Sequence, residues 1–81
     1  ATLMLARDEE VPIGEAVVIY RGPASGNTFD IDVIIPAFDP QSPFHHRLSI
    51  AEARKGFTLA RHSFRLLSAT RSILHLEQIG G

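Results

Sequence analysis

The sequence predicts an α+β domain that is mainly β: a small antiparallel sheet or barrel, in strand, strand, strand, helix, strand order, with one amphipathic helix. Two runs with the two-residue period of a strand and one later run with the period of a helix carry this prediction. The 81 residues suffice for a single domain, residues 1–81. A chain this short buries only about 60% of the surface that its unfolded form exposes. Because it has no cysteine for disulfides, we expect a dimer or higher oligomer to add buried surface.

A hairpin is the strongest local prediction. Residues 15–20 (EAVVIY) are rich in β-branched side chains and predict a strand. Residues 28–35 (TFDIDVII) alternate, so their apolar side chains face one way while Asp30 and Asp32 face the other. The intervening residues 21–27 (RGPASGN) have the composition of a turn. We therefore expect the two strands to pair.

Weaker patterns predict the remaining strands and one loop. Thr2 to Ala6 (TLMLA) is expected to form the first strand, and residues 72–79 (SILHLEQI) the last. Pro36 to Pro43 contains three prolines. Since proline has no N–H to donate to a ladder, we expect a loop over these residues.

The helix is predicted to begin at Ser49, whose hydroxyl can cap the first turn, with Glu52 placed to complete a capping box. Apolar residues then recur at spacings of three and four from Ile50 to Leu67, which indicates a helix of about five turns. Gly56 conflicts with it, because glycine inside a helix costs ~1 kcal/mol relative to alanine. Alternatively, Gly56 caps a short helix and residues 57–67 form a strand. The alternation there is poor, so we favour the longer helix.

The charges are divided unequally along the chain. Residues 1–39 contain two basic and seven acidic residues, whereas residues 40–81 contain six basic and two acidic ones. Such asymmetry can mark an anion-binding face, or the two halves can neutralise each other within one fold or across a dimer. We favour neutralisation, because the net charge of −1 is unlike the strongly basic balance of dedicated nucleic-acid-binding domains.

Arg54, Arg61 and Arg65 are spaced so that they follow one stripe of the predicted helix, beside its apolar face. A row of guanidinium groups binds phosphates and gives salt-sensitive affinity for nucleic acid. An ordinary solvated face explains the same stripe equally well.

We expect no enzymatic activity, no cofactor and no metal. The sequence contains no Gly-x-Ser-x-Gly elbow, no P-loop and no dinucleotide-binding fingerprint. Strand alternation explains Asp30 and Asp32 as a solvated face. The four histidines lack the converging spacing of a zinc site and are expected at the surface: His45, His46, His62 and His75.

The sequence predicts a cytoplasmic protein without a membrane partner. It has no apolar run of the ~20 residues that a membrane-spanning helix needs. Its N-terminus lacks the basic start and apolar centre of a secretory signal.

The most specific motifs lie at residues 13–36: Ile-Gly-Glu-Ala-Val, then Gly26-Asn27, Ile31, Val33 and Pro36 without a gap. This pattern resembles the Ile-Gly-Asp-x-Val strand, Gly-Asn turn, alternating strand and Ala-Pro ending of the carbon storage regulator family. These are small bacterial RNA-binding translational regulators. Leu3 to Arg7 (LMLAR) is similar to the family's Leu-x-Leu-x-Arg strand, and His46-Arg47 to its Val-His-Arg segment. The resemblance covers about residues 3–50.

The resemblance implies a homodimer with exchanged strands that binds a GGA-bearing RNA loop on the edge formed by its first and last strands. It places Leu5, Arg7 and Arg47 on that edge. We therefore expect a small non-enzymatic binding regulator, with RNA-binding translational regulation as the first hypothesis. The alternative is a protein-interaction or assembly subunit, such as a homo-oligomer or a phage or adaptor component, with no nucleic-acid role. It would use the apolar helix stripe or an exposed strand edge.

Overall fold

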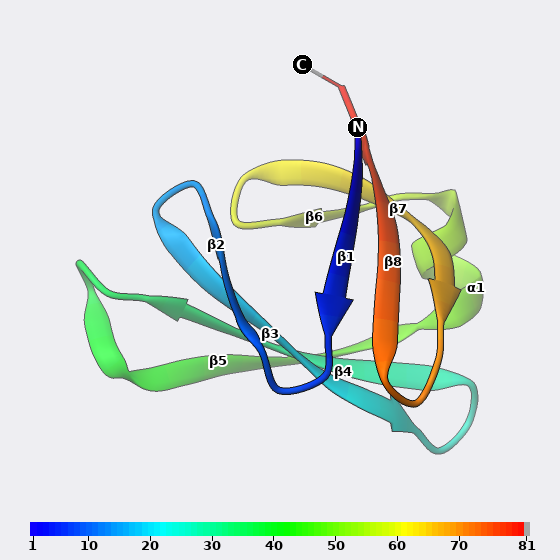
Figure 1. The fold of residues 1–81 in the computed structure, drawn as a ribbon, viewed down its shortest axis with the longest axis horizontal. Helices are drawn as coiled ribbons and strands as arrows, with labels where there is room; N and C mark the ends of the chain where they lie inside the picture. The colour runs from blue at the N-terminus through cyan, green and yellow to red at the C-terminus, as the bar shows by residue number, and fades with distance from the viewer. Residues whose placement is uncertain (81) are drawn as a thin grey trace.

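The computed structural model describes residues 1–80, which form two four-stranded sheets and one short helix (Figure 1). The terminal sheet has the strand order β1-β8-β7-β6, and the central sheet has the order β2-β3-β4-β5. Neighbouring strands in both sheets run antiparallel. The elements are β1 (Thr2–Ala6), β2 (Glu10–Ile13), β3 (Ala16–Ala24), β4 (Thr28–Ile35), β5 (Asp39–Ser49), α1 (Ile50–Lys55), β6 (Phe57–Leu59), β7 (His62–Ala69) and β8 (Ile73–Ile79).

The two sheets cross each other, and β1 and β8 contact β3 where they cross (Figure 1). Alternate side chains of the strands fill the space between the sheets, as the strand period requires. A row of aromatic rings connects the sheets through this core: Tyr20, Phe29, Phe57 and Phe64 follow one another at centroid distances of 6.4, 6.4 and 6.1 Å. The buried residues that pack together in this core are Leu5, Ala16, Val18, Tyr20, Phe29, Ile31, Val33, Ala53, Leu59, Phe64, Leu66, Leu74 and Leu76.

The predicted class is confirmed: the described residues are mainly β, in antiparallel sheets with one helix. β1 and β4 have the predicted bounds, and β3 pairs with β4 as the predicted hairpin. The predicted element order is wrong, because five strands precede α1 and three follow it. Within residues 1–80, no helix is long and apolar enough to cross a membrane.

The predicted five-turn helix over residues 50–67 is wrong. α1 begins at the predicted cap, where the Ser49 hydroxyl accepts a hydrogen bond of 3.4 Å from the Glu52 N–H. It ends after only six residues, at Lys55, because Gly56 takes a φ of 130°, which favours glycine. The alternative of a short helix capped by Gly56 describes the chain correctly, and residues 57–67 are extended.

The turn between β6 and β7 explains why the helical pattern misled. Ala60 and Arg61 connect Leu59 to His62, which face each other across the hairpin. Both turn residues have positive φ, 53° and 68°. Two-residue hairpins with this geometry favour Asn-Gly, because a Cβ costs roughly 1–2 kcal/mol per residue in the left-handed region. Because this turn contains neither glycine nor asparagine, the sequence shows no sign of a hairpin at these residues.

The loop predicted from Pro36 to Pro43 is partly wrong, because β5 already begins at Asp39. β5 is an edge strand of the central sheet, where proline is tolerated. The ladder nevertheless breaks where the prolines lie. The register with β4 passes from Asp39 directly to Phe44, so residues 40–43 have no counterpart in β4.

Candidate functional site

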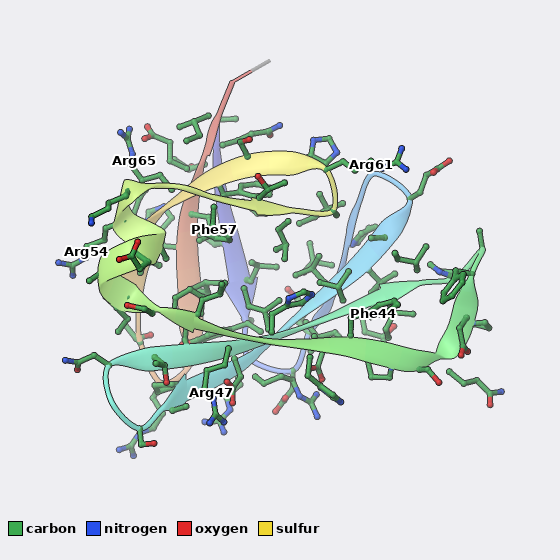
Figure 2. The ribbon with its side chains drawn as sticks, turned by 180° about the vertical axis from the view of Figure 1, so that it is seen from behind. Phe44, Arg47, Arg54, Phe57, Arg61 and Arg65 are labelled. Carbon is green, nitrogen blue, oxygen red and sulfur yellow. The ribbon has the colours of Figure 1, made fainter. Side chains whose placement is uncertain are left out.

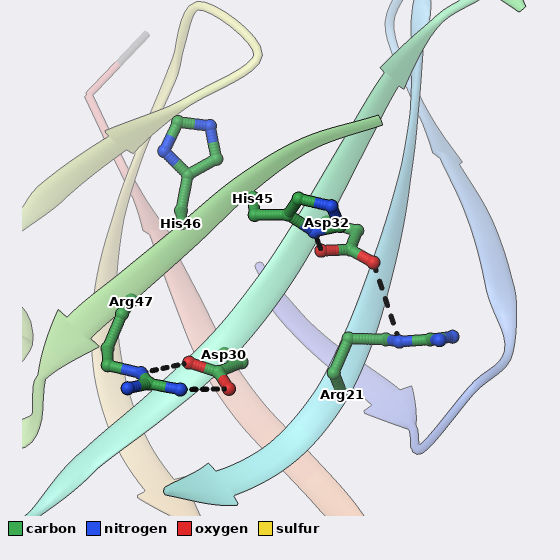
Figure 3. A pocket seen from close by; sticks show the side chains of 6 residues that line it. All are labelled: Arg21, Asp30, Asp32, His45, His46 and Arg47. Carbon is green, nitrogen blue, oxygen red and sulfur yellow. Dashed lines mark hydrogen bonds and ion pairs between the residues drawn. The ribbon is translucent and has the colours of Figure 1, made fainter. Parts of the chain in front are cut away.

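A ladder of charged side chains covers the outer face of the central sheet (Figure 3). Asp30 and Asp32 point outward from β4, as the alternation of that strand predicts, while Phe29, Ile31 and Val33 turn into the core. Arg47 lies opposite Asp30 and His45 lies opposite Asp32, both on β5. Acidic residues on one strand thus meet basic residues on the next.

The expectation of a solvated face is wrong for Asp32, which is only 7% exposed and is the one buried charged residue among those described. Its carboxylate lies 2.5 Å from Nδ1 of His45 and 3.4 Å from Nε of Arg21. Arg21 stands at the bulge of β3 and also contacts Asp8 at 3.0 Å. The two contacts from Arg21 and His45 compensate the desolvation of the buried carboxylate.

Arg47 donates two hydrogen bonds to Asp30, of 2.8 and 3.1 Å. These bonds hold the pKa of Asp30 below its ordinary value and raise the pKa of Arg47. The bidentate geometry saturates most of the guanidinium edge with a carboxylate of the same chain. Arg47 therefore contributes little free positive charge to the outer face.

The charged ladder borders a shallow depression of about 470 Å³. An aspartate–histidine pair can orient a general base, but the side chains around the depression include no serine, threonine or cysteine to act as a nucleophile. Residues 1–80 contain no cluster of three or more histidine, cysteine or acidic side chains that could hold a metal ion. The depression is lined by Arg21, Asp30, Asp32, His45, His46 and Arg47.

The structure separates the residues expected on an RNA-binding edge. The Leu5 side chain is completely buried in the core, so it offers no surface to a ligand. Arg7 follows β1 and lies over Gly22, where a Cβ would come within 2.9 Å of the guanidinium carbon. Its Nη1 donates to the carbonyl of Arg71 at 3.4 Å. Arg47 belongs instead to the charged ladder of the central sheet.

The predicted stripe of Arg54, Arg61 and Arg65 is also wrong, because it requires a continuous helix. Arg54 is on α1, Arg61 is in the β6–β7 turn, and Arg65 is on β7. Figure 2 shows Arg54 and Arg61 at opposite sides of the molecule. Arg65 forms an ion pair with Glu77 of β8, which lowers the pKa of Glu77.

The β4–β5 hairpin carries two exposed phenylalanines that sequence reasoning missed. Phe38 is 75% exposed and Phe44 is 44% exposed, and their rings stack with centroids 6.1 Å apart. A turn closed by the Phe38 N–H and the Ile35 carbonyl, at 2.9 Å, brings the chain back toward β4. Phe38 and Phe44 lie on either side of Pro40 and Pro43. These prolines hide the strand period that would have identified the two aromatic residues.

An apolar groove lies beside these rings, between the β4–β5 hairpin and the β6–β7 turn. Its volume is about 260 Å³, and we call it the hairpin groove. It adjoins a second cavity of about 250 Å³ that Glu15 and Arg61 help to line. Ile35 and Phe44, which line the groove, are among the exposed large apolar residues. The hairpin groove is lined mainly by Val33, Ile35, Phe44, His46, Leu59 and Ala60.

Comparison with known protein families, characterised proteins and solved structures finds no match to this chain.

Proposed function

We propose that this chain is a non-enzymatic protein-interaction or assembly domain that binds a protein partner through the tip of the β4–β5 hairpin. The observation that carries the proposal is the stacked pair Phe38 and Phe44, exposed beside an apolar groove. Exposed apolar patches are unfavourable in water, and aromatic side chains that fill apolar pockets dominate the energetics of many interfaces.

The distribution of charge favours a protein partner over nucleic acid. Arg21, Arg47 and Arg65 already contact carboxylates of the same chain. A phosphate would have to displace those carboxylates before it could form an ion pair with these arginines. Neutralised arginines release few counterions, and counterion release supplies much of the affinity for nucleic acid.

Site-specific photo-cross-linking tests this proposal. The variant Phe38→p-benzoylphenylalanine places the reactive group at the hairpin tip, and Met4→p-benzoylphenylalanine is the matched control at an exposed apolar position on the terminal sheet. On irradiation in cells, we expect a protein adduct from position 38 that the additional change Phe44→Ser removes, and none from position 4. A nuclease-sensitive adduct, equal adducts from both positions, or no adduct would refute the proposal.

RNA-binding translational regulation is the second candidate, and two observations favour it. Residues 13–36 resemble the carbon storage regulators, and Arg7 contacts the carbonyl of Arg71, so two arginines without an ion pair in residues 1–80 lie near each other. Under this candidate, Arg7→Ala weakens binding of a GGA hairpin RNA and lowers the salt slope by about one. Arg54→Ala is the control. A gel-shift assay without a salt-sensitive complex excludes the candidate.

A further inference from the structure

We propose that the protein partner is a second copy of this chain, and that two copies insert Phe38 into each other's hairpin groove, with Asp39 of each facing Arg61 of the other. This inference rests on the proposed function, since it names the partner of the same hairpin surface. Four features of the chain support it. They are the size of the groove, the presence of the Phe38 ring and the groove on one chain, the charges beside the ring and the groove, and the strained turn that borders the groove.

The groove has the size and chemistry to hold one phenyl ring. Its volume is about 260 Å³, and its lining includes Val33, Ile35 and Leu59. An apolar cavity of roughly 150 Å³ is already large enough to bind benzene. Phe38, at 75% exposure, presents most of its ring for insertion.

The projecting ring and the groove lie on the same chain, which makes the surface self-complementary. Phe44 belongs to both parts, because it lines the groove and stacks against Phe38. In a two-fold dimer the same patch is used by both copies, and every contact occurs twice. Two Phe38 rings and two grooves would then be covered in one interface.

The charges beside the ring and the groove are complementary. Asp39 follows Phe38, and Arg61 follows Ala60 of the groove. Within residues 1–80 neither charge has an ion-pair partner, and Glu15, which lines the neighbouring cavity, lies beyond ion-pair distance of Arg61. Hydrogen bonds from Gln41 and Ser42 lower the pKa of Asp39, so its carboxylate is ionised at neutral pH. Insertion of Phe38 brings the two opposite charges toward each other.

The strained turn at Ala60 and Arg61 also indicates a binding site at the hairpin groove. Both residues hold positive φ, which glycine or asparagine would adopt at lower cost. Backbone strain of this kind is concentrated at binding sites, where the side chains have a second use. Here Ala60 lines the groove, and Arg61 carries the charge that would face Asp39.

The prolines of β5 favour this face-to-face contact over pairing of strand edges. β5 is the long edge strand of the central sheet, and an exposed edge can pair with another chain. Pro40 and Pro43 lack the N–H that such pairing needs, and they lie beside Asp39 and Phe44. We therefore expect two copies to associate at the hairpin tip through side-chain contacts and not through backbone hydrogen bonds.

Charge reversal tests the inference on the purified full chain. Sedimentation velocity and light scattering are expected to give twice the chain mass of 8.9 kDa for the wild type. Asp39→Arg and Arg61→Glu should each weaken association at least tenfold, because like charges then meet twice in the dimer. The matched controls are Glu9→Arg and Arg54→Glu, and circular dichroism checks that every variant is folded.

Mixing the two single variants gives the decisive result. Asp39→Arg gives one chain two positive charges at the interface, and Arg61→Glu gives the other two negative charges. We expect an equimolar mixture to form a heterodimer by native mass spectrometry. The inference is overturned if the wild type is monomeric even at about 0.1 mM, where a dimer with a micromolar Kd is almost fully formed. It is also overturned if charge reversal has no effect on association, or if mixing the two variants does not restore it. A photo-adduct from position 38 with a different protein would then leave the proposed function standing while refuting the second copy.

Discussion

The hydroxyl of Tyr20 on β3 donates a hydrogen bond of 2.6 Å to the carbonyl of Thr70, in the turn between β7 and β8. The bond joins the central sheet to the terminal sheet at one end of the aromatic row. Burial raises the pKa of Tyr20, so the hydroxyl keeps its proton over the whole physiological range.

Tyr20→Phe should lower the free energy of unfolding by about 1 kcal/mol, the usual net contribution of a hydrogen bond. The ring itself stays packed against Phe29, so the loss reports on the bond alone. Urea unfolding followed by circular dichroism measures the difference. An unchanged midpoint would mean that the Thr70 carbonyl finds water as readily as it finds Tyr20.

Leu5→Ala should lower the free energy of unfolding by about 2–5 kcal/mol, because it opens a cavity in a fully buried position. In a domain of this size the loss is a large fraction of total stability. Under the RNA-binding candidate, the folded fraction should still bind RNA no more weakly than the wild type, since Leu5 has no exposed surface. A selective loss of RNA affinity without a loss of stability would contradict the buried position.

The double variant Ala60→Asn/Arg61→Gly should raise the free energy of unfolding by about 1–2 kcal/mol, because both residues suit positive φ. It should also weaken self-association, since it removes the charge that faces Asp39. Arg61→Gln alone removes the charge without a residue suited to positive φ, and it separates the two effects. Thermal unfolding gives the stability and sedimentation gives the association. Unchanged stability would show that the turn is not strained.

Asp30→Asn should destabilise the domain at pH 7, and the difference from the wild type should disappear in acid. The folded pKa of Asp30 is depressed by the hydrogen bonds from Arg47. Its stabilising contribution is therefore complete above the unfolded pKa of about 3.9 and is lost as the pH falls through the lower folded value. Urea titrations between pH 7 and pH 2 measure this. A difference that persists at pH 2 would contradict the role of the ion pair.

The sequence was informative where one face of a strand is buried and the other is charged. β4 has its predicted bounds because Phe29, Ile31 and Val33 alternate with Asp30 and Asp32 without interruption. A shift of the strand by one residue would expose these apolar side chains, so only one register buries them. The local pattern and the tertiary structure therefore agree.

Residues 57–67 misled because two short strands and a tight turn imitate a helical period. Leu59, Phe64 and Leu66 are the buried residues of this segment, and they follow the strand period only when the two-residue turn is known. Leu67, at the bulge of β7, completed the false helical stripe. The arginine stripe failed with the helix on which it depended.

The candidate site was less predictable than the fold. The pairing of Asp30 with Arg47 requires the register between β4 and β5, and the prolines of β5 concealed that strand. Phe38 and Phe44 become neighbours only through the bulge that they flank. Contacts across a broken ladder depend on tertiary geometry that no local period encodes.

The pairing of β1 with β8 has a consequence for synthesis on the ribosome. Strands β2 to β5 are contiguous in sequence, so the central sheet can form once residue 49 has emerged. β1 must wait for β8, since Leu5 faces Leu74 and Thr2 faces Glu77. Contacts between segments so distant in sequence slow folding, and until they form the apolar side of β1 is open to other nascent chains.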